Sequence, residues 1–430
     1  MKTAFTRAGK VLAMLLLAAV PAGAEPASVR ALVSQTGMRI PDDQARELES
    51  MLGQLFIINV DGFGWSGPLA LEPPFAKLVA RLQIGGVIPH YASSDYERIR
   101  RTNRALSELT TLPLLICSDI LKLRGKSRTG TFGDGYVGGF LGRFKKLGDP
   151  ELSTLATLNA FALAAAGINV ALGPTVDAST TDPRTADRAR IVIEQLKRFG
   201  LSPVLKHFPF LPATASLHHA SPDTHLSLAE AEKRFAIFQQ LSTEAGIMMT
   251  THLYDSPVDA ALATFSPAWN VLLRKQTGFR GLLMTDGLLM LKNYADRSVL
   301  AGGPSGAEVA GIDETAVWAV RAILAGHDFI IIEGSAAQTV RAFDGLLAAA
   351  CRRTDIGALL RARIHESAAR IARWKQDNRA SLLRQVDVTM SDINAVIAAL
   401  PGDEADLSEF HFDHSVIASL EPSFKAAAVK

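Results

Sequence analysis

The sequence has little cysteine, little excess charge and no long apolar run beyond its first residues. Its 430 residues include only two cysteines, Cys117 and Cys351, so the paired cysteines of a zinc site are absent. Lysine and arginine number 45 against 43 acidic residues, a net charge of +2, which argues against a nucleic-acid-binding face. Cys117 lies within an apolar run, where we expect a buried free thiol.

The amino-terminal segment has the pattern of a secretory signal peptide. Basic residues at positions 2, 7 and 10 precede an apolar core at 11–20, and Ala22-Gly23-Ala24 forms a small-residue cleavage site. The apolar core is too short for a stable membrane span, and no later run is long enough for one. We therefore expect residues 1–24 to be removed and the remaining chain to be periplasmic or secreted.

Short apolar runs recur along the chain, and each ends in polar or glycine residues. They are residues 54–60, 85–88, 113–117, 169–176, 202–207, 246–251, 281–285 and 328–332. Helical patterns lie between them, for example at 152–166 and 228–243. Eight alternating units predict an α/β fold, a single (β/α)8 TIM-type barrel over about residues 46–345. An open doubly wound sheet would need a glycine-rich phosphate loop after the first strand, and residues 61–65 do not match one.

The chain is predicted to have three segments. The signal peptide covers residues 1–24, the barrel domain 25–350, and a C-terminal helical extension 351–430. The extension begins with an amphipathic helix at 356–376, which we expect to pack on the barrel exterior.

Two strand ends carry chemically useful side chains. One run ends in Lys206-His207-Phe208-Pro209, and another ends in Asp286-Gly287. In a (β/α)8 barrel the active site lies at the carboxyl ends of the strands, so these residues are candidates. Other runs end at or beside Asp61, His90, Asp119, Asp177, His252 and Glu333.

A loop after Lys206-His207 holds Asp223 two residues before His225. In an extended or turned segment this pair can hydrogen-bond. Asp223 can then fix the tautomer of His225 and raise its basicity.

A metal site and a nucleotide site are the two alternatives to this arrangement. Histidines at 207, 218, 219, 225 and 252 suggest a metal, but the His-x-His of barrel metal hydrolases is absent from the first strand. Residues 133–138 match G-x-G-x-x-G without following a strand directly, which favours a glycine-rich loop over a nucleotide site. We therefore expect no metal and no cofactor.

These features resemble the family 3 glycoside hydrolases, specifically their single-domain bacterial β-N-acetylglucosaminidases. The most specific matches are Lys206-His207-Phe208-Pro209, Asp223-Thr224-His225 and Thr285-Asp286-Gly287-Leu288. Weaker matches are residues 85–88, 173–177 and 325–328. The resemblance implies a barrel enzyme that hydrolyses terminal β-linked N-acetylhexosamine with retention of configuration, and a carbohydrate as its partner.

The resemblance also implies roles for individual residues. Asp286 matches the nucleophile, and His225, held by Asp223, matches the general acid/base. The residues that match substrate-binding positions are Asp119, Lys206, His207 and Arg188.

The sequence departs from the family pattern in three places. Residues 120–123 replace the usual Gln-Glu-Gly-Gly, and residues 210–212 replace Gly-His-Gly. The second strand ends in Pro89-His90-Tyr91, where the family has an aromatic residue followed by Arg-Asn. Three alternatives therefore stay open: a periplasmic glycan-binding barrel with weakened catalysis, a β-glucosidase-like enzyme, and a phosphorolytic relative. The sequence does not indicate an oligomeric state.

Overall fold

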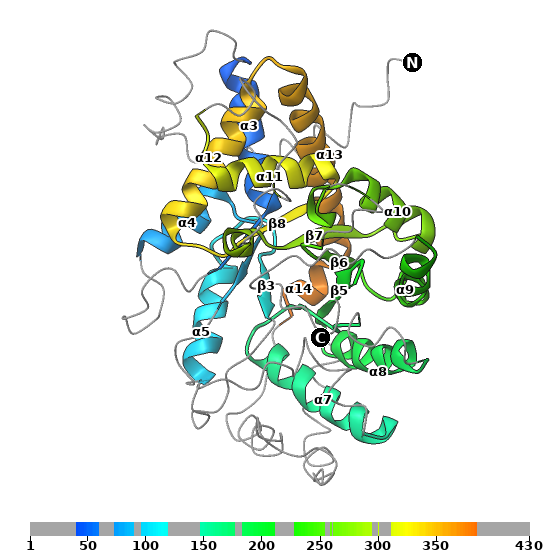
Figure 1. Ribbon diagram of the computed structural model, residues 1–430. Coiled ribbons are helices and arrows are strands. Elements are labelled where there is room, and N and C mark those ends of the chain that lie inside the picture. The colour runs from blue at the N-terminus through cyan, green and yellow to red at the C-terminus, as the bar shows by residue number, and fades with distance from the viewer. Residues whose placement is uncertain are drawn as a thin grey trace.

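Eight parallel strands close into a single barrel in the computed structural model (Figure 1). The strands pair in chain order, and β8 pairs with β1 to complete the ring. The structure describes residues 40–59, 73–89, 96–118, 147–176, 183–210, 228–253, 259, 261–294, 300 and 311–384. The (β/α)8 prediction is confirmed.

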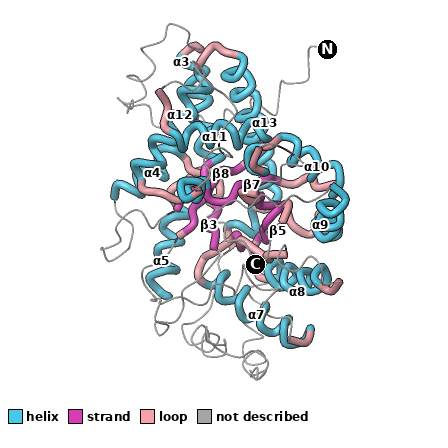
Figure 2. The backbone as a smooth tube through the Cα atoms, in the orientation of Figure 1, coloured by secondary structure: helices cyan, strands magenta, loops and turns pink. Residues whose placement is uncertain are grey.

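Each strand coincides with one of the predicted apolar runs. The strands are β1 (Phe56–Asn59), β2 (Gly86–Ile88), β3 (Leu115–Ser118), β4 (Val170–Ala171), β5 (Ser202–Phe208), β6 (Ile247–Thr250), β7 (Leu282–Gly287) and β8 (Phe329–Ile332). Nearly all their residues are buried, because a strand of a parallel barrel has the interior on one face and helices on the other. Figure 2 shows the strands at the centre with helices around them.

Strand β4 is much shorter than its apolar run. The sequence predicted residues 169–176, but only Val170–Ala171 form a ladder. Pro174, which has no N–H to donate, lies within the run, and only an isolated bridge between Thr175 and Lys206 follows it. A run of apolar residues therefore overestimates the length of a strand that contains proline.

The helices form the outer layer of the barrel. They are α3 (Asp42–Leu52), α4 (Pro73–Leu82), α5 (Tyr96–Ser107), α7 (Asp149–Ala165), α8 (Thr185–Arg198), α9 (Leu228–Leu241), α10 (Pro267–Thr277), α11 (Glu314–Ala325), α12 (Ala336–Cys351), α13 (Asp355–Asp377) and α14 (Arg379–Leu382). Short 3-10 turns occur at η1 (Gly53–Leu55), η4 (Ala263–Phe265) and η5 (Leu288–Asn293). The predicted helix at 356–376 is α13, which packs against α3, α11 and α12.

Side chains at the helix starts explain where several helices begin. Ser266 accepts a hydrogen bond from the backbone N–H of Trp269, and Ser335 forms a reciprocal capping box with Gln338. Such caps satisfy N–H groups that have no partner within the helix. Each helix of the barrel follows a strand, so helix starts and strand ends lie at the same edge, which is where the candidate site lies.

Both cysteines are buried free thiols, as expected for Cys117. Within the described ranges, no helix combines the length and the apolar character needed to cross a bilayer. Residues 1–39, which include the predicted signal peptide, and residues 385–430 lie outside the described part of the chain.

Candidate active site at the barrel mouth

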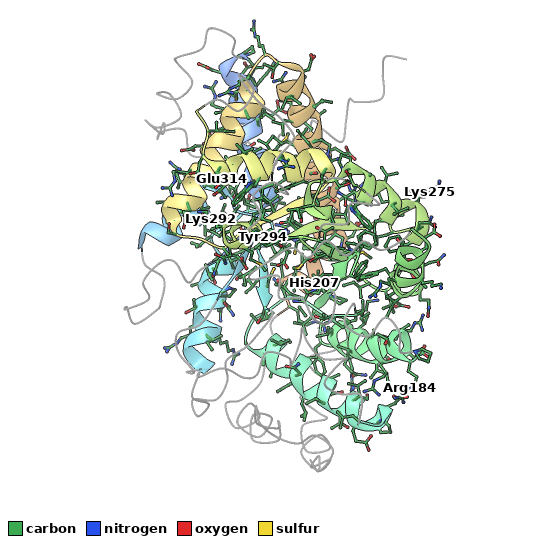
Figure 3. The ribbon with its side chains drawn as sticks, in the orientation of Figure 1. Arg184, His207, Lys275, Lys292, Tyr294 and Glu314 are labelled. Atoms are coloured by element: carbon green, nitrogen blue, oxygen red, sulfur yellow. The ribbon has the colours of Figure 1, made fainter. Side chains whose placement is uncertain are left out.

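Asp286 stands near the end of β7, within reach of the end of β5. Its Oδ2 atom lies 3.8 Å from Nε2 of His207, and its Oδ1 atom accepts a hydrogen bond of 2.8 Å from the Gly287 N–H. The two side chains are 16% and 13% exposed, so both are largely enclosed but reachable from solvent. Figure 3 shows His207 in the central part of the molecule, near the strand ends.

The surroundings of Asp286 keep its carboxylate ionised. Burial raises the pKa of Asp286, but His207, His252 and Lys206 and the Gly287 N–H outweigh this effect and hold its pKa below the ordinary value. An ionised carboxylate that is partly enclosed and steered by neighbouring cations is suited to nucleophilic attack.

Lys206 and His207 belong to β5, whose end packs against helices α9 and α10. The next residue, Phe208, makes ring contacts with Phe235 and with Trp269, at centroid distances of 5.2 and 6.2 Å. Lys206 itself is only 4% exposed, although it carries an ammonium group. The peptides Lys206–His207 and Phe208–Pro209 are both cis. The structure thus brings Lys206, His207 and Asp286 together, as the strand-end pattern predicted; their roles in catalysis and binding stay predictions.

A fully buried histidine, His252, links the end of β6 to the backbone beside Asp286. Its Nε2 atom lies 2.8 Å from the Gly287 carbonyl oxygen, and its Nδ1 atom lies 2.7 Å from Oγ1 of Thr264. The Tyr294 hydroxyl donates to the His252 carbonyl oxygen at 3.0 Å. These contacts hold the Asp286–Gly287 turn from the β6 side.

The protonation of His252 follows from its burial. Burial lowers the pKa of His252, and this outweighs the attraction of the nearby Asp286 carboxylate. A neutral imidazole has one N–H, which Nε2 donates to the Gly287 carbonyl oxygen. The one proton of the Thr264 hydroxyl then has two acceptors within reach, His252 Nδ1 at 2.7 Å and the Thr251 carbonyl oxygen at 3.0 Å. Because His252 is neutral near pH 7, it adds little positive charge beside Asp286 there.

Sequence reasoning missed part of this group. The sequence indicated His252 as a strand end and as one of the histidines of a metal site, but not as a support for Asp286, and it did not indicate Thr264 or Tyr294 at all. Thr264 lies in η4 and Tyr294 directly follows η5, so only the tertiary fold brings them to His252. No local motif signals such contacts.

Arg188 lies on α8 and joins two helices. It is 2% exposed, and its Nη1 atom donates to the Leu147 carbonyl oxygen at 3.0 Å and to Asp149 Oδ1 at 3.2 Å. These bonds tie α8 to the start of α7, which gives Arg188 a structural role. Its predicted role in substrate binding stays a prediction.

Three other predicted site residues, Asp119, Asp223 and His225, lie outside the described residues. The same holds for the glycine-rich loop at 133–138 and for the histidines at 218 and 219. Among the residues that the structure does describe, no group of three or more His, Cys, Asp or Glu side chains could hold a metal ion.

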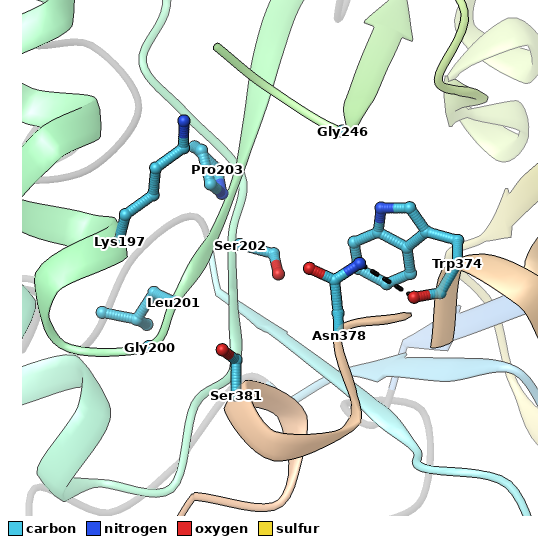
Figure 4. Close-up of a pocket in the computed structure, with 9 residues that line it drawn as sticks. All are labelled: Lys197, Gly200, Leu201, Ser202, Pro203, Gly246, Trp374, Asn378 and Ser381. Carbon is cyan, nitrogen blue, oxygen red and sulfur yellow. Dashed lines mark hydrogen bonds between the residues drawn. The ribbon is translucent and has the colours of Figure 1, made fainter. Parts of the chain in front are cut away.

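A separate pocket lies at the opposite, amino-terminal end of the strands. It is lined by Ser202 and Gly246 at the strand starts, by Trp374 of α13, by Ser381 of α14 and by Asn378 between these two helices (Figure 4). The Nδ2 atom of Asn378 donates a hydrogen bond of 2.8 Å to the Trp374 carbonyl oxygen. Chemistry in this fold occurs at the other end of the barrel, so the pocket is not part of the candidate site.

Comparison with known proteins decides the family. Residues 47–374 match the family described as Glycosyl hydrolase family 3 N terminal domain. The chain belongs to glycosyl hydrolase family 3. The part of the family that matches is its amino-terminal domain. No curated protein sequence matches the chain.

Solved structures of family 3 proteins have a similar fold. A fungal multi-domain β-N-acetylglucosaminidase is 22% identical with a TM-score of 0.62; the match covers 80% of this chain and 41% of that one. A β-glucoside phosphorylase, BglX bound to 2FGlc, is 18% identical (TM-score 0.58), with 83% and 64% covered. A β-N-acetylhexosaminidase from Beutenbergia cavernae is 22% identical (TM-score 0.56), with 76% and 98% covered. The chain thus spans about two fifths of the first of these structures, and at such identities the likeness is one of fold alone.

Proposed function

We propose that this family 3 protein is a retaining exo-glycosidase that hydrolyses terminal β-linked N-acetylhexosamine, N-acetylglucosamine above all. The observation that carries the proposal is the ionised Asp286 carboxylate, 3.8 Å from His207 and with a pKa held below its ordinary value. The resemblance of residues 206–209, 223–225 and 285–288 to bacterial β-N-acetylglucosaminidases supports the choice of sugar. The similar fold of the Beutenbergia cavernae enzyme also supports it.

The proposed reaction has two steps. Asp286 attacks the anomeric carbon, the bond to the leaving oxygen breaks, and His225 gives its proton to that oxygen. His225 then takes a proton from water, which attacks the same carbon and releases both the sugar and the Asp286 carboxylate. Two inversions leave the configuration unchanged, and Asp223 keeps His225 in the tautomer that the proton transfers need.

Release of aryl alcohol from an aryl β-N-acetylglucosaminide tests the proposal. Asp286→Asn removes the nucleophilic charge and should abolish release, whereas Asp187→Asn, at an exposed position of α8, should leave it unchanged. A 2-fluoro glycosyl donor should form a covalent adduct on Asp286 that mass spectrometry locates. Activity that survives Asp286→Asn would refute this assignment of the nucleophile. A properly folded wild type with no turnover would favour the glycan-binding alternative.

Phosphorolysis is the second candidate. Lys206 and His207 place basic side chains beside Asp286, which suits an anionic acceptor, and a histidine acid/base adds no negative charge to repel phosphate. One of the similar structures is a β-glucoside phosphorylase. Product analysis in inorganic phosphate separates the two reactions, because phosphorolysis yields a glycosyl phosphate and hydrolysis yields the free sugar.

Export is part of the proposal. The signal-like residues 1–24 motivate it, and the substrate would then be glycans of the cell envelope. Mass spectrometry of the mature amino terminus should find it near Glu25; an intact Met1 in the periplasmic fraction would contradict cleavage.

A further inference from the structure

Glu333, directly after β8, lies beside the backbone of the candidate nucleophile. A Cβ atom built on Gly287 would collide with the carboxylate of Glu333, so this carboxylate packs against the Gly287 Cα. Gly287 follows Asp286 in the chain, and β7 and β8 are neighbouring strands. Two acidic side chains, Asp286 and Glu333, therefore end adjacent strands of the barrel.

The strand register shows that Glu333 faces the barrel interior. The Phe56 ring lies 5.4 Å from the Phe343 ring of α12, so Phe56 points outward to the helices. Phe56 pairs with Ile330, and Ile58 with Ile332, which therefore also point outward. Alternation along the strand turns Ile331 and then Glu333 inward, and Gly287, the partner of Ile331, meets Glu333 on that side.

The mouth therefore has charges of opposite sign on its two sides. Lys206 and His207 lie toward β5, and Glu333 lies toward β8, with Asp286 between them. A sugar attacked by Asp286 has its anomeric carbon at this point. The two ring neighbours of that carbon are the ring oxygen, which has no proton, and carbon 2, which carries a donor group. A carboxylate only accepts hydrogen bonds, so Glu333 suits the group on carbon 2.

We propose that Glu333 accepts a hydrogen bond from the nitrogen on carbon 2 of the bound sugar and so selects 2-amino-2-deoxy sugars. This inference rests on the proposed glycosidase function and adds to it a specificity residue and a wider substrate class. The acetamido N–H of N-acetylglucosamine is one such donor. The ammonium group of an unacetylated glucosaminide is a stronger one, because it adds the attraction between two opposite charges to the hydrogen bond.

Aryl β-glycosides with an ammonium, an acetamido or a hydroxyl group on carbon 2 test the inference at pH 6. Glu333→Gln keeps the shape but loses the charge. It should lower kcat/KM about 10- to 100-fold for the 2-amino substrate, a few-fold for the acetamido substrate, and least for the glucoside. Glu333→Asp keeps the charge with a shorter reach and should retain part of the preference. Glu314→Gln, exposed at the start of α11, is the matched control and should change nothing.

An equal loss for all three substrates in Glu333→Gln would refute the inference, since it would mean a general role in folding or catalysis. Thermal unfolding of each variant separates a folding defect from a change in specificity. If the wild type turns over none of the substrates, the hydrolase proposal fails, but binding of glucosamine, N-acetylglucosamine and glucose can still be measured by calorimetry. Selective loss of glucosamine binding in Glu333→Gln supports the role of Glu333, and equal binding of all three sugars overturns it.

Discussion

Lys375 on α13 is a lysine buried at the amino-terminal end of the barrel. It is 0% exposed, and its Nζ atom donates to Gln54 Oε1 at 2.9 Å and to the Gly85 carbonyl oxygen at 2.8 Å. Both partners are neutral. Burial lowers the pKa of Lys375 from 10.5 to about 7. The folded protein therefore holds this side chain half protonated near neutral pH.

The lowered pKa makes the free energy of unfolding depend on pH. Between pH 7 and 10.5 the unfolded chain binds the Lys375 proton and the folded chain does not, so stability rises with pH in this window. Below pH 7 both states are protonated and this contribution is constant at its least favourable value. With about 1.4 kcal/mol per pH unit, and allowing for half titration at pH 7, stability should rise by about 2 kcal/mol from pH 7 to pH 9.

Lys375→Met keeps the length of the side chain and removes the charge. The variant should lose the rise in stability between pH 7 and pH 9. It leaves Gln54 Oε1 without the ammonium donor, at a cost of roughly 1–3 kcal/mol, whereas the Gly85 carbonyl oxygen keeps the Leu115 N–H. Below pH 7 the gain from the missing charge exceeds this cost, so the variant should be the more stable protein there.

Urea unfolding at pH 6, 7, 8 and 9 measures the effect, with Lys275→Met at an exposed position of α10 as the control. The series stops at pH 9 because burial raises the pKa of Cys117 to about 12. That shift lowers stability as pH rises above 9, and its size differs in Lys375→Met because Lys375 acts on the Cys117 thiol. Wild-type and Lys375→Met curves that run parallel over this range would refute the reasoning, since they would mean that Lys375 is protonated equally in both states.

Three further predictions concern the barrel mouth. Gly287→Ala places a methyl group where the carboxylate of Glu333 now packs. The resulting shift of Asp286 should lower kcat/KM by about 100-fold in aryl glycoside assays. Thr264→Val removes the hydroxyl bonded to His252 and should cost about 1–3 kcal/mol of stability with a fall in kcat, whereas Thr264→Ser should restore both. His207→Gln removes the group that most lowers the pKa of Asp286, so the acid limb of the pH–rate profile should move to higher pH.

The fold was predictable because its signal is repeated. Each of the eight buried strands corresponds to an apolar run in the sequence, and these runs alternate with helical patterns throughout the barrel. Strand ends were less predictable, as the two-residue strand β4 shows, because hydrogen-bond pairing depends on the neighbouring strands. The meeting of Lys206, His207 and Asp286 followed from the barrel rule that strand carboxyl ends share one face.

The supporting contacts of the site were not predictable. Glu333 was visible as a strand end, but its packing on Gly287 depends on the register between β7 and β8, which includes a shift between Met284 and Gly287. The bond from His252 to the Gly287 carbonyl oxygen likewise joins positions 35 residues apart. One-dimensional patterns show which residues reach the mouth; they do not show which atoms meet there.

Helix α13 opens the predicted C-terminal extension, and its charged residues pack against the barrel. Asp328, at the start of β8, is 0% exposed and lies 3.4 Å from Arg370 and 3.9 Å from Arg363, both of α13. Burial raises the pKa of Asp328 despite these guanidinium groups. Without α13 this carboxylate would lose two of its charged partners, and an uncompensated buried charge costs about 3–5 kcal/mol. The family match extends to residue 374, which lies within this helix. Buried charged groups therefore have different effects at the two ends of the barrel. At the amino end, Asp328 and the arginines of α13 join this helix to the strands. At the carboxyl end, the groups around Asp286 keep its carboxylate ionised.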